Sequence, residues 1–240
     1  MRLWRLVAVL MLLPGLAAAQ QVSIDFGDAG SLSGRAVQLL ALVTVLSLVP
    51  GLAVMVTCFP FIVTVLSILR QALGLQQAPP NMLIVTLALF LTWFVMDPVL
   101  TEAWARGIDP LTRNAITLEE AIPATLQPFR VFMSARLDPD TFAALAALRP
   151  GPVPALPEAP LSLLVPSFLL SEIQRAFEIG FLIFLPFLII DLVVAAILMS
   201  MGMMMVPPAV VALPFKLAFF VVADGWSLLS AALVRGYLGS

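Results

Sequence analysis

Methionines gather at one point of this chain, and their type and spacing suit three kinds of chemistry. Five of the eleven methionines lie between residues 199 and 205, in the stretch MSMGMMMVPP. Thioethers bind copper(I), so Met199 and Met201 could form a soft metal site. The unbranched side chain also repacks around irregular shapes, so Met203, Met204 and Met205 could form a deformable seal. Ordinary apolar packing of a turn is the third interpretation, and the residue types alone leave all three open.

A second group of side chains places charge inside apolar sequence. Glu172, Arg175 and Glu178 are spaced at i, i+3 and i+6, so neighbouring members lie one turn apart on a helical face. Asp191 and Lys216 each stand alone in an apolar stretch. A charge at the centre of a bilayer costs roughly 2.5–3.5 kcal/mol, so each of these groups is expected to have a partner.

A turn at the methionines would bring Asp191 and Lys216 to the same depth. Gly202, Pro207 and Pro208 are the residues that would make this hairpin turn, because glycine and proline are the strongest breaks in apolar sequence. The two charges could then pair within one hairpin, or with the next copy of the chain in an assembly. A structural ion pair, an intermolecular pair and a proton or ion relay all stay open.

The chain offers little of the chemistry that enzymes use. It has no histidine, and Cys58 is its only cysteine, which excludes disulfides within the chain and histidine-based acid–base catalysis, and with them most zinc sites. Asp191 and Asp224 could be imagined as an intramembrane aspartyl pair, but no nucleophile–base arrangement accompanies them. We therefore expect a protein without enzymatic activity and without a metal or other cofactor.

The elements that position these residues are those of a membrane protein. Of 240 residues, 62% are hydrophobic and 11% are charged, whereas a soluble domain is about a quarter charged. We predict an all-α membrane protein with about four long apolar helices, arranged as kinked helical hairpins. The net charge of −2 gives no electrostatic reason to expect nucleic acid as a partner.

Composition divides the sequence into five segments. The first residues combine Arg2 and Arg5 with a short apolar run and an alanine-rich end, which is typical of a secretory signal. An uncleaved membrane helix is the alternative, although the run is shorter than the about 20 residues that a span needs. The predicted segments are 1–19, a cleaved signal peptide; 20–35, a polar N-terminal arm; 36–98, a first helical hairpin; 99–160, an extracytoplasmic polar segment of short helices; and 161–240, a second helical hairpin with the methionine-rich turn.

The orientation of these segments rests on the signal peptide, which places residues 101–160 outside the cytoplasm. Arginine counts favour the opposite, because this segment holds five arginines. The positive-inside rule is weaker for loops of about 60 residues, so we follow the signal peptide.

Two long stretches resemble one known family. The first contains VTVLSILRQALGLQQAPPN and LALFLTWFVMDPV, and the second runs from PSFLLSEIQRAF to FFVVADGW. Together they cover about half of the chain and resemble the FliP family of flagellar export-gate proteins. The related SctR proteins of injectisomes share most of this pattern, but MVPPAVVALPFK is more similar to the flagellar branch.

The resemblance implies a core subunit of the flagellar type III protein export gate, in the bacterial inner membrane at the flagellar basal body. Much of the chain, including residues 99–160, is then expected on the periplasmic side. Family members form a ring, which is a pentamer, together with FliQ-like and FliR-like gate subunits. FlhA-like and FlhB-like export proteins are further partners, and the substrates are unfolded flagellar subunits.

The resemblance also gives two sets of residues a role. One set lines the pore as a gasket that seals it around a passing chain, and the other forms salt bridges that support assembly. The gasket set is Met203, Met204 and Met205, with Met199 and Met201 in support. The assembly set is Glu172, Arg175, Glu178, Asp191 and Lys216.

Two positions depart from the family's pattern. Phe61 stands where many relatives carry a basic residue, and the basic residue of a SELKTAF-like stretch is shifted here to Arg175, in SEIQRAF. A shift of one residue turns a side chain by roughly 100° around a helix, so the partner of Arg175 is expected to differ. A small-solute or copper transporter and a purely structural scaffold are the alternative functions.

Overall fold

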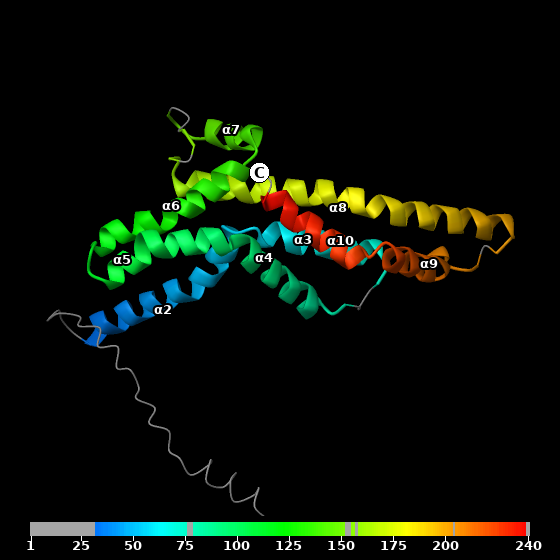
Figure 1. Ribbon diagram of the computed structural model, residues 1–240, viewed down its shortest axis with the longest axis horizontal. Helices are drawn as coiled ribbons and strands as arrows, with labels where there is room; N and C mark the ends of the chain where they lie inside the picture. Colours follow the sequence, from blue (N-terminus) through cyan, green and yellow to red (C-terminus); the bar gives the residue numbers. More distant parts are fainter. Residues whose placement is uncertain (1–31, 76–78, 152–154, 157, 204, 239–240) are drawn as a thin grey trace, which may run out of the picture. The chain divides into compact units, whose positions relative to one another are not determined.

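The computed structural model describes residues 32–75, 79–151, 155–156, 158–203 and 205–238, and these residues form helices without β-strands (Figure 1). The predicted signal peptide and nearly all of the predicted N-terminal arm lie outside the described residues. In chain order the helices are α2 (Leu32–Met55), α3 (Phe59–Ala72), α4 (Asn81–Ala103), the π-helix η1 (Trp104–Ile108), α5 (Asp109–Thr112), α6 (Leu118–Arg136), α7 (Pro139–Ala147), α8 (Leu161–Ser200), α9 (Pro208–Val222) and α10 (Gly225–Leu238). The prediction of an all-α fold is confirmed.

The chain divides into two compact units, Met1–Leu46 and Ser47–Ser240. The described part of the first unit is the N-terminal portion of α2. Helix α2 ends at Met55, and residues 56–58 separate it from α3, which has Pro60 in its first turn. Helices α3 to α10 all belong to the second unit.

Three of the described helical stretches are long and apolar enough to cross a membrane: Val37–Met55, Asn81–Thr112 and Leu161–Ser200. Helices α9 and α10 together make a fourth, although the chain bends by 61° between them. The bend falls next to Asp224, which has a φ of +48°. The sequence predicts about four long apolar helices but does not predict that the last one is broken into two.

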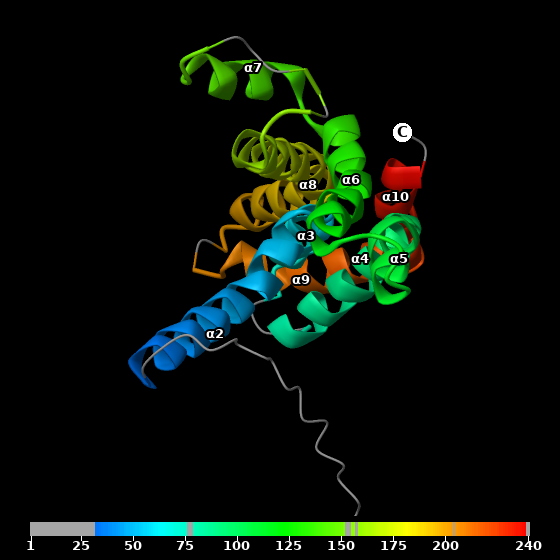
Figure 2. The ribbon, with the colours of Figure 1, turned by 90° about the vertical axis from the view of Figure 1, so that its left-hand side faces the viewer.

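Helix α3 lies at the centre of the second unit. Its buried side chains are Phe61, Ile62, Val65, Leu66, Leu69 and Ala72. They form one core cluster with residues of α4, α8, α9 and α10, and Figure 2 shows α3 enclosed by its neighbours. A short helix that is buried in this way orders the longer helices around it, which is how residues far apart in sequence meet at one site.

Helix α8 has two parts with different surroundings. Its 40 residues span roughly 60 Å at 1.5 Å per residue, which is twice the about 30 Å of a bilayer's hydrocarbon core. The N-terminal part carries Glu172, Arg175 and Glu178 and contributes Leu164 and Phe168 to a core shared with α6 and α7. The C-terminal part, residues 181–200, contains one charged residue, Asp191. The polar segment of the chain therefore covers only the charged part of α8.

The polar segment packs closely because its helices begin at defined caps and meet at a glycine. Thr117 and Glu120 form a capping box at the start of α6, and this bonding lowers the pKa of the Glu120 carboxyl. Asp138 caps α7 by accepting a hydrogen bond of 2.8 Å from the backbone N–H of Thr141. In η1, a Cβ on Gly107 would lie 1.9 Å from Thr125 Oγ1, so glycine is needed for α6 to approach the π-helix.

Candidate functional site

The methionine-rich turn has the backbone of a Schellman motif, with glycine in the left-handed position. Gly202 has a φ of +73°, its N–H donates to the Met199 carbonyl at 3.0 Å, and the Met203 N–H donates to the Leu198 carbonyl at 2.9 Å. These bonds satisfy carbonyls at the end of α8. Pro207 precedes the first residue of α9 and Pro208 occupies it, where the missing N–H of proline costs nothing.

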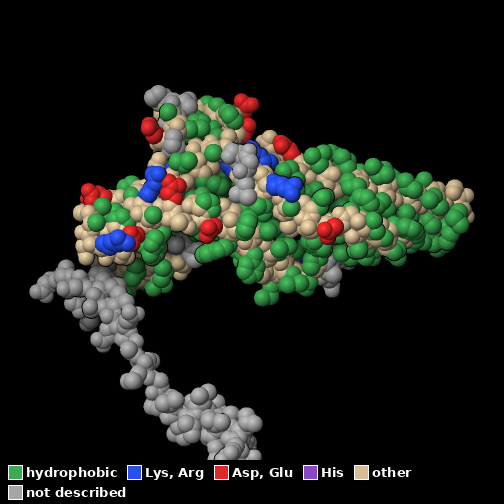
Figure 3. All heavy atoms as spheres, viewed as in Figure 1, with side chains coloured by type: hydrophobic (Ala, Val, Ile, Leu, Met, Phe, Trp, Pro, Cys, Tyr) green, Lys and Arg blue, Asp and Glu red, His purple; other side chains and the backbone are tan. Residues whose placement is uncertain are grey.

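The side chains of this turn point away from the fold. Met205 is 97% exposed, and Met199, Met201 and Met203 are also exposed, while Met204 lies outside the described residues. Figure 3 shows apolar side chains covering the end of the molecule where α8 meets the turn, with the basic and acidic side chains of this face lying away from that end. On helices with the length and composition of membrane spans, exposed apolar side chains suit contact with lipid or with another apolar surface.

Asp191 and Lys216 pair across the two helices that carry the turn. Lys216 Nζ lies 2.6 Å from Asp191 Oδ2, so the structure shows the pairing within one hairpin that the sequence leaves open. Lys216 also donates to the Ala72 carbonyl at 2.9 Å, which joins α9 to the end of α3. Among the described residues, Asp191 Oδ1 is buried without a hydrogen-bond partner.

A second ionic group centres on Glu172, which is completely buried. Its Oε1 accepts a hydrogen bond of 3.1 Å from Arg136 Nε, and its Oε2 accepts one from the Tyr237 hydroxyl. The Arg136 guanidinium also donates to the Gly236 carbonyl at 2.7 Å and lies 3.8 Å from the centre of the Tyr237 ring. These contacts join α6, α8 and α10, and we call Arg136, Glu172, Arg175 and Tyr237 the Glu172 cluster.

Arg175 is the most exposed member of the Glu172 cluster. Its Nη1 lies 3.7 Å from Glu172 Oε1, and its side chain is 38% exposed. Glu178, one turn further along, accepts a hydrogen bond of 3.0 Å from Gln174 instead. The i, i+3, i+6 spacing thus brings Glu172 and Arg175 together but leaves Glu178 on the surface.

Sequence reasoning missed Arg136 and Tyr237. They lie 36 and 65 residues from Glu172, so no helical periodicity connects them to it. The available signals were that Tyr237 is the only tyrosine of the chain and that a buried carboxylate requires basic partners. Phe61, at one of the two positions that depart from the family's pattern, lies edge-on to Tyr237 with 5.5 Å between ring centres.

The described residues contain no group of three or more histidine, cysteine, aspartate or glutamate side chains that could hold a metal ion. The site is instead an apolar turn with one buried ionic contact, at Glu172, and one partly buried contact, between Asp191 and Lys216, that join the helices behind it. Such an arrangement suits contact with another apolar or polypeptide surface.

Comparison with known proteins assigns the chain to a family. The FliP family model matches residues 42–233. The flagellar biosynthetic protein FliP of Caulobacter vibrioides is 49% identical over 228 residues, which cover 94% of this chain and 86% of that protein. Its counterpart from Agrobacterium fabrum is 46% identical over 96% of this chain and 97% of its own length, and that from Bacillus subtilis is 45% identical over 84% and 91%. The chain belongs to the FliP family.

Proposed function

We propose that the chain is a core subunit of the flagellar type III protein export gate, where several copies form a ring that conducts unfolded substrates and seals around them. The relatives are named flagellar biosynthetic proteins, which supports the flagellar assignment. The observation that carries the sealing role is the exposed methionine turn at the end of two apolar helices, with Met205 97% exposed.

In this proposal the ring is a pentamer, and the turns of its copies converge on the pore axis. Methionine suits the inner surface because it is flexible and apolar, so it can close the pore and also yield to varied polypeptide side chains. Gly202 and the two prolines hold the turns of all copies at the same depth along the pore axis, since the Schellman motif fixes the end of α8. The Asp191–Lys216 pair fixes the position of α9 along the axis of α8.

We propose that FliQ-like and FliR-like subunits complete the gate, and that FlhA-like and FlhB-like proteins deliver the substrates. The gate would lie in the inner membrane at the basal body, with the polar segment on the periplasmic side. The protein performs no chemical step in this proposal, because gating requires only that the turns separate and close.

The test is to replace Met203, Met204 and Met205 with alanine in the gate assembled with its partner subunits. We expect the copy number of the complex to be unchanged and the membrane to leak small solutes, because alanine leaves the pore unfilled. Flux of a small dye from proteoliposomes measures the leak.

Two controls separate sealing from general damage. Replacing the same three residues with leucine keeps the apolar character but removes the flexibility of the methionine side chains. This variant should leak less than the triple alanine variant. Met82→Ala removes an exposed methionine of α4 and should give none. Wild-type permeability in the triple alanine variant would contradict the seal and favour a purely structural scaffold.

A further inference from the structure

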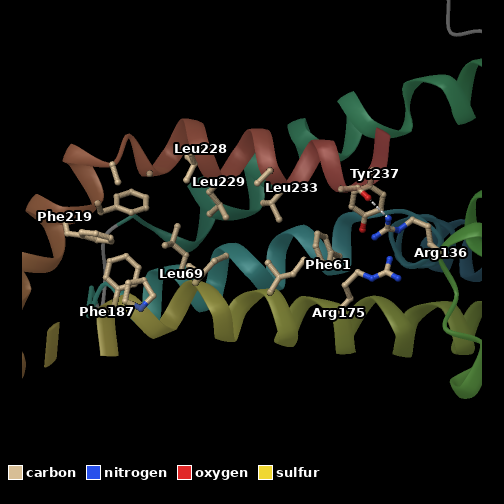
Figure 4. Close-up of a pocket in the computed structure, with 18 of the residues that line it drawn as sticks. Phe61, Leu69, Arg136, Arg175, Phe187, Phe219, Leu228, Leu229, Leu233 and Tyr237 are labelled. Carbon is tan, nitrogen blue, oxygen red and sulfur yellow. Dashed lines mark hydrogen bonds between the residues drawn. The ribbon is translucent and has the colours of Figure 1, made fainter. Parts of the chain in front are cut away.

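Helix α10 is held to the second unit by a narrow stripe of residues. Among its residues whose burial the structure describes, the buried ones are Gly225, Leu229, Leu233 and Tyr237, which are spaced one helical turn apart. Figure 4 shows Leu229 and Leu233 directed toward α3. A helix packed on a core usually buries about three to four residues over two turns. Elements with few buried contacts are those that open while the rest of a protein stays folded.

An apolar groove of about 630 Å³ separates α10 from α8 along this length. Leu228 and Ala232 of α10 line it on one side, and Ile179 and Ile183 of α8 line it on the other. The side of α10 that faces α8 therefore borders open space rather than a packed core.

The chain can turn α10 at one residue. Helix α9 ends at Val222 and α10 begins at Gly225, with a bend of 61° between the two helices. Asp224 lies at this bend with a φ of +48°, which is uncommon for a residue other than glycine. Hinges are a few residues at the ends of elements that absorb changes in φ and ψ. A change at Asp224 to ordinary helical angles would bring α10 toward the axis of α9 and lift its buried stripe off α3.

The other end of α10 is locked to the Glu172 cluster. The Tyr237 hydroxyl donates a hydrogen bond to the buried Glu172 carboxylate. The Arg136 guanidinium donates to the Gly236 carbonyl at 2.7 Å and lies over the Tyr237 ring. The same ring stacks on Phe132, with 6.1 Å between ring centres. Release of α10 breaks these contacts and takes one partner from a buried carboxylate, which is costly unless another partner replaces it.

Arg175 is placed to be that replacement. It lies one turn from Glu172 on the same helix, so it stays within reach when α10 moves. Its Nη1 is 3.7 Å from Glu172 Oε1, which is too long for a hydrogen bond, and it also interacts electrostatically with the Asp138 carboxylate. Its side chain is 38% exposed and can shift the short distance that separates it from Glu172.

We propose that α10 is a latch with two positions. In the closed position, which the structure shows, Tyr237 is bound to Glu172. In the open position α10 has swung about Asp224 as a rigid helix, and Arg175 has moved onto the Glu172 carboxylate. Helices α3, α6 and α8 keep their packing in both positions. Opening uncovers one face of α3, so the latch controls access to the centre of the second unit.

Thiol labelling of the full-length protein in mild detergent tests the latch, in a Cys58→Ala background that removes the native thiol. Leu229→Cys places a thiol on the stripe that opening uncovers. Leu164→Cys places one in the core of α6, α7 and α8, where Leu164 is completely buried. N-ethylmaleimide reacts with accessible thiolates, so a buried thiol reacts only when the structure around it opens. We expect Leu229→Cys to react faster than Leu164→Cys, because α10 opens without the rest of the unit.

Two further changes should move the labelling rate of Leu229→Cys in opposite directions. Tyr237→Phe removes the hydroxyl of the lock and should raise the rate about tenfold, the effect of one hydrogen bond to a charged group. Arg175→Gln removes the partner of the open position and should lower the rate about threefold, the effect of a partly exposed ion pair. Arg235→Gln, at an exposed position of α10, is the matched control and should leave the rate unchanged.

Three results would overturn the proposal. Equal labelling rates at the two cysteines, or an equal increase at both in Tyr237→Phe, would mean that α10 opens only with the whole protein. An unchanged rate at Leu229→Cys in Tyr237→Phe would mean that Tyr237 is not the lock. A higher rate at Leu229→Cys in Arg175→Gln would mean that Arg175 only supports the closed structure.

Discussion

At the scale of single residues, Glu172 stabilises the site through three elements at once. It is completely buried, and its carboxylate accepts hydrogen bonds from Arg136 of α6 and Tyr237 of α10. A buried charge is tolerated only with such partners, and removal of one partner leaves the other uncompensated. The contribution of Glu172 is therefore large because Arg136 is also buried, with 6% of its side chain exposed.

Glu172→Gln tests this arrangement. It leaves the Arg136 guanidinium buried without a counter-charge, and breaking a buried pair typically lowers the free energy of unfolding by about 3–5 kcal/mol. Glu178→Gln is the matched control: its carboxylate is exposed and bonded to Gln174, so the change should stay within about 0.5 kcal/mol. Thermal unfolding of the detergent-solubilised protein compares the two variants, and equal losses would contradict the role of Glu172.

The sequence predicts these residues only in part. The cost of charge in apolar sequence identifies Glu172, Arg175, Glu178, Asp191 and Lys216 as needing partners. The structure shows ion pairs for all of these except Glu178, which accepts a hydrogen bond from Gln174. The cost of charge does not identify Arg136 or Tyr237, because these approach Glu172 through the tertiary packing of α6 and α10. Local periodicity contains no information about contacts between elements so far apart in the chain.

At the scale of elements, the described apolar stretches become helices as predicted, because buried backbone in a membrane must satisfy its own hydrogen bonds. Two features of the elements are not predictable from composition. Helical structure continues past Pro98 through η1 to Thr112, with Gly107 allowing α6 to pack there. The last apolar stretch bends after α9, where Asp224 takes a left-handed conformation that residue statistics do not favour.

The cap of α7 gives a pH-dependent prediction at this scale. Hydrogen bonds from the side chain and backbone of Thr141 lower the pKa of the Asp138 carboxyl below its ordinary value of 3.8. A depressed folded-state pKa contributes stability that is fully present above the unfolded value and is lost as the pH falls through the folded one. The amides of α7 should therefore lose protection from hydrogen exchange below about pH 4.

Variants of Asp138 identify the carboxyl responsible. Asp138→Asn keeps an acceptor for Thr141 and should remove the acid-dependent step, while Asp138→Ala should expose the amides of α7 at every pH. Asp140→Ala removes an equal charge from the exposed first turn of α7 and serves as the control. If Asp138→Asn kept the same acid-dependent loss of protection as the wild type, the assignment to Asp138 would be wrong.

At the scale of the whole molecule, the second unit separates two kinds of surface. Most of its charged side chains lie between residues 97 and 178, in the polar helices and the N-terminal part of α8, and the C-terminal part of α8 ends with α9 in an apolar methionine turn (Figure 3). This separation, together with membership of the FliP family, is the basis of the proposed ring. In the proposed ring the turn would lie at the pore, and the polar segment would support the helices from the periplasmic side.

The chain is well suited to cysteine cross-linking, which can test the proposed ring. Cys58 is its only cysteine, it is completely buried, and burial raises the pKa of its thiol to about 12. Thiol reagents act on the thiolate of accessible cysteines, so Cys58 should not react. A cysteine introduced at an exposed position is therefore the single reactive thiol of each copy.

The measurement that tests the central claim most directly is cross-linking of Met205→Cys with a short bis-maleimide in the assembled gate. Met205 is almost fully exposed at the tip of the turn, and Met82→Cys, at a site 80% exposed on α4, is the control. If the turns of neighbouring copies converge on a pore, Met205→Cys should give covalent dimers of this chain and Met82→Cys should not. Absence of dimers at position 205, or equal dimer formation at position 82, would contradict a pore sealed by the methionine turns.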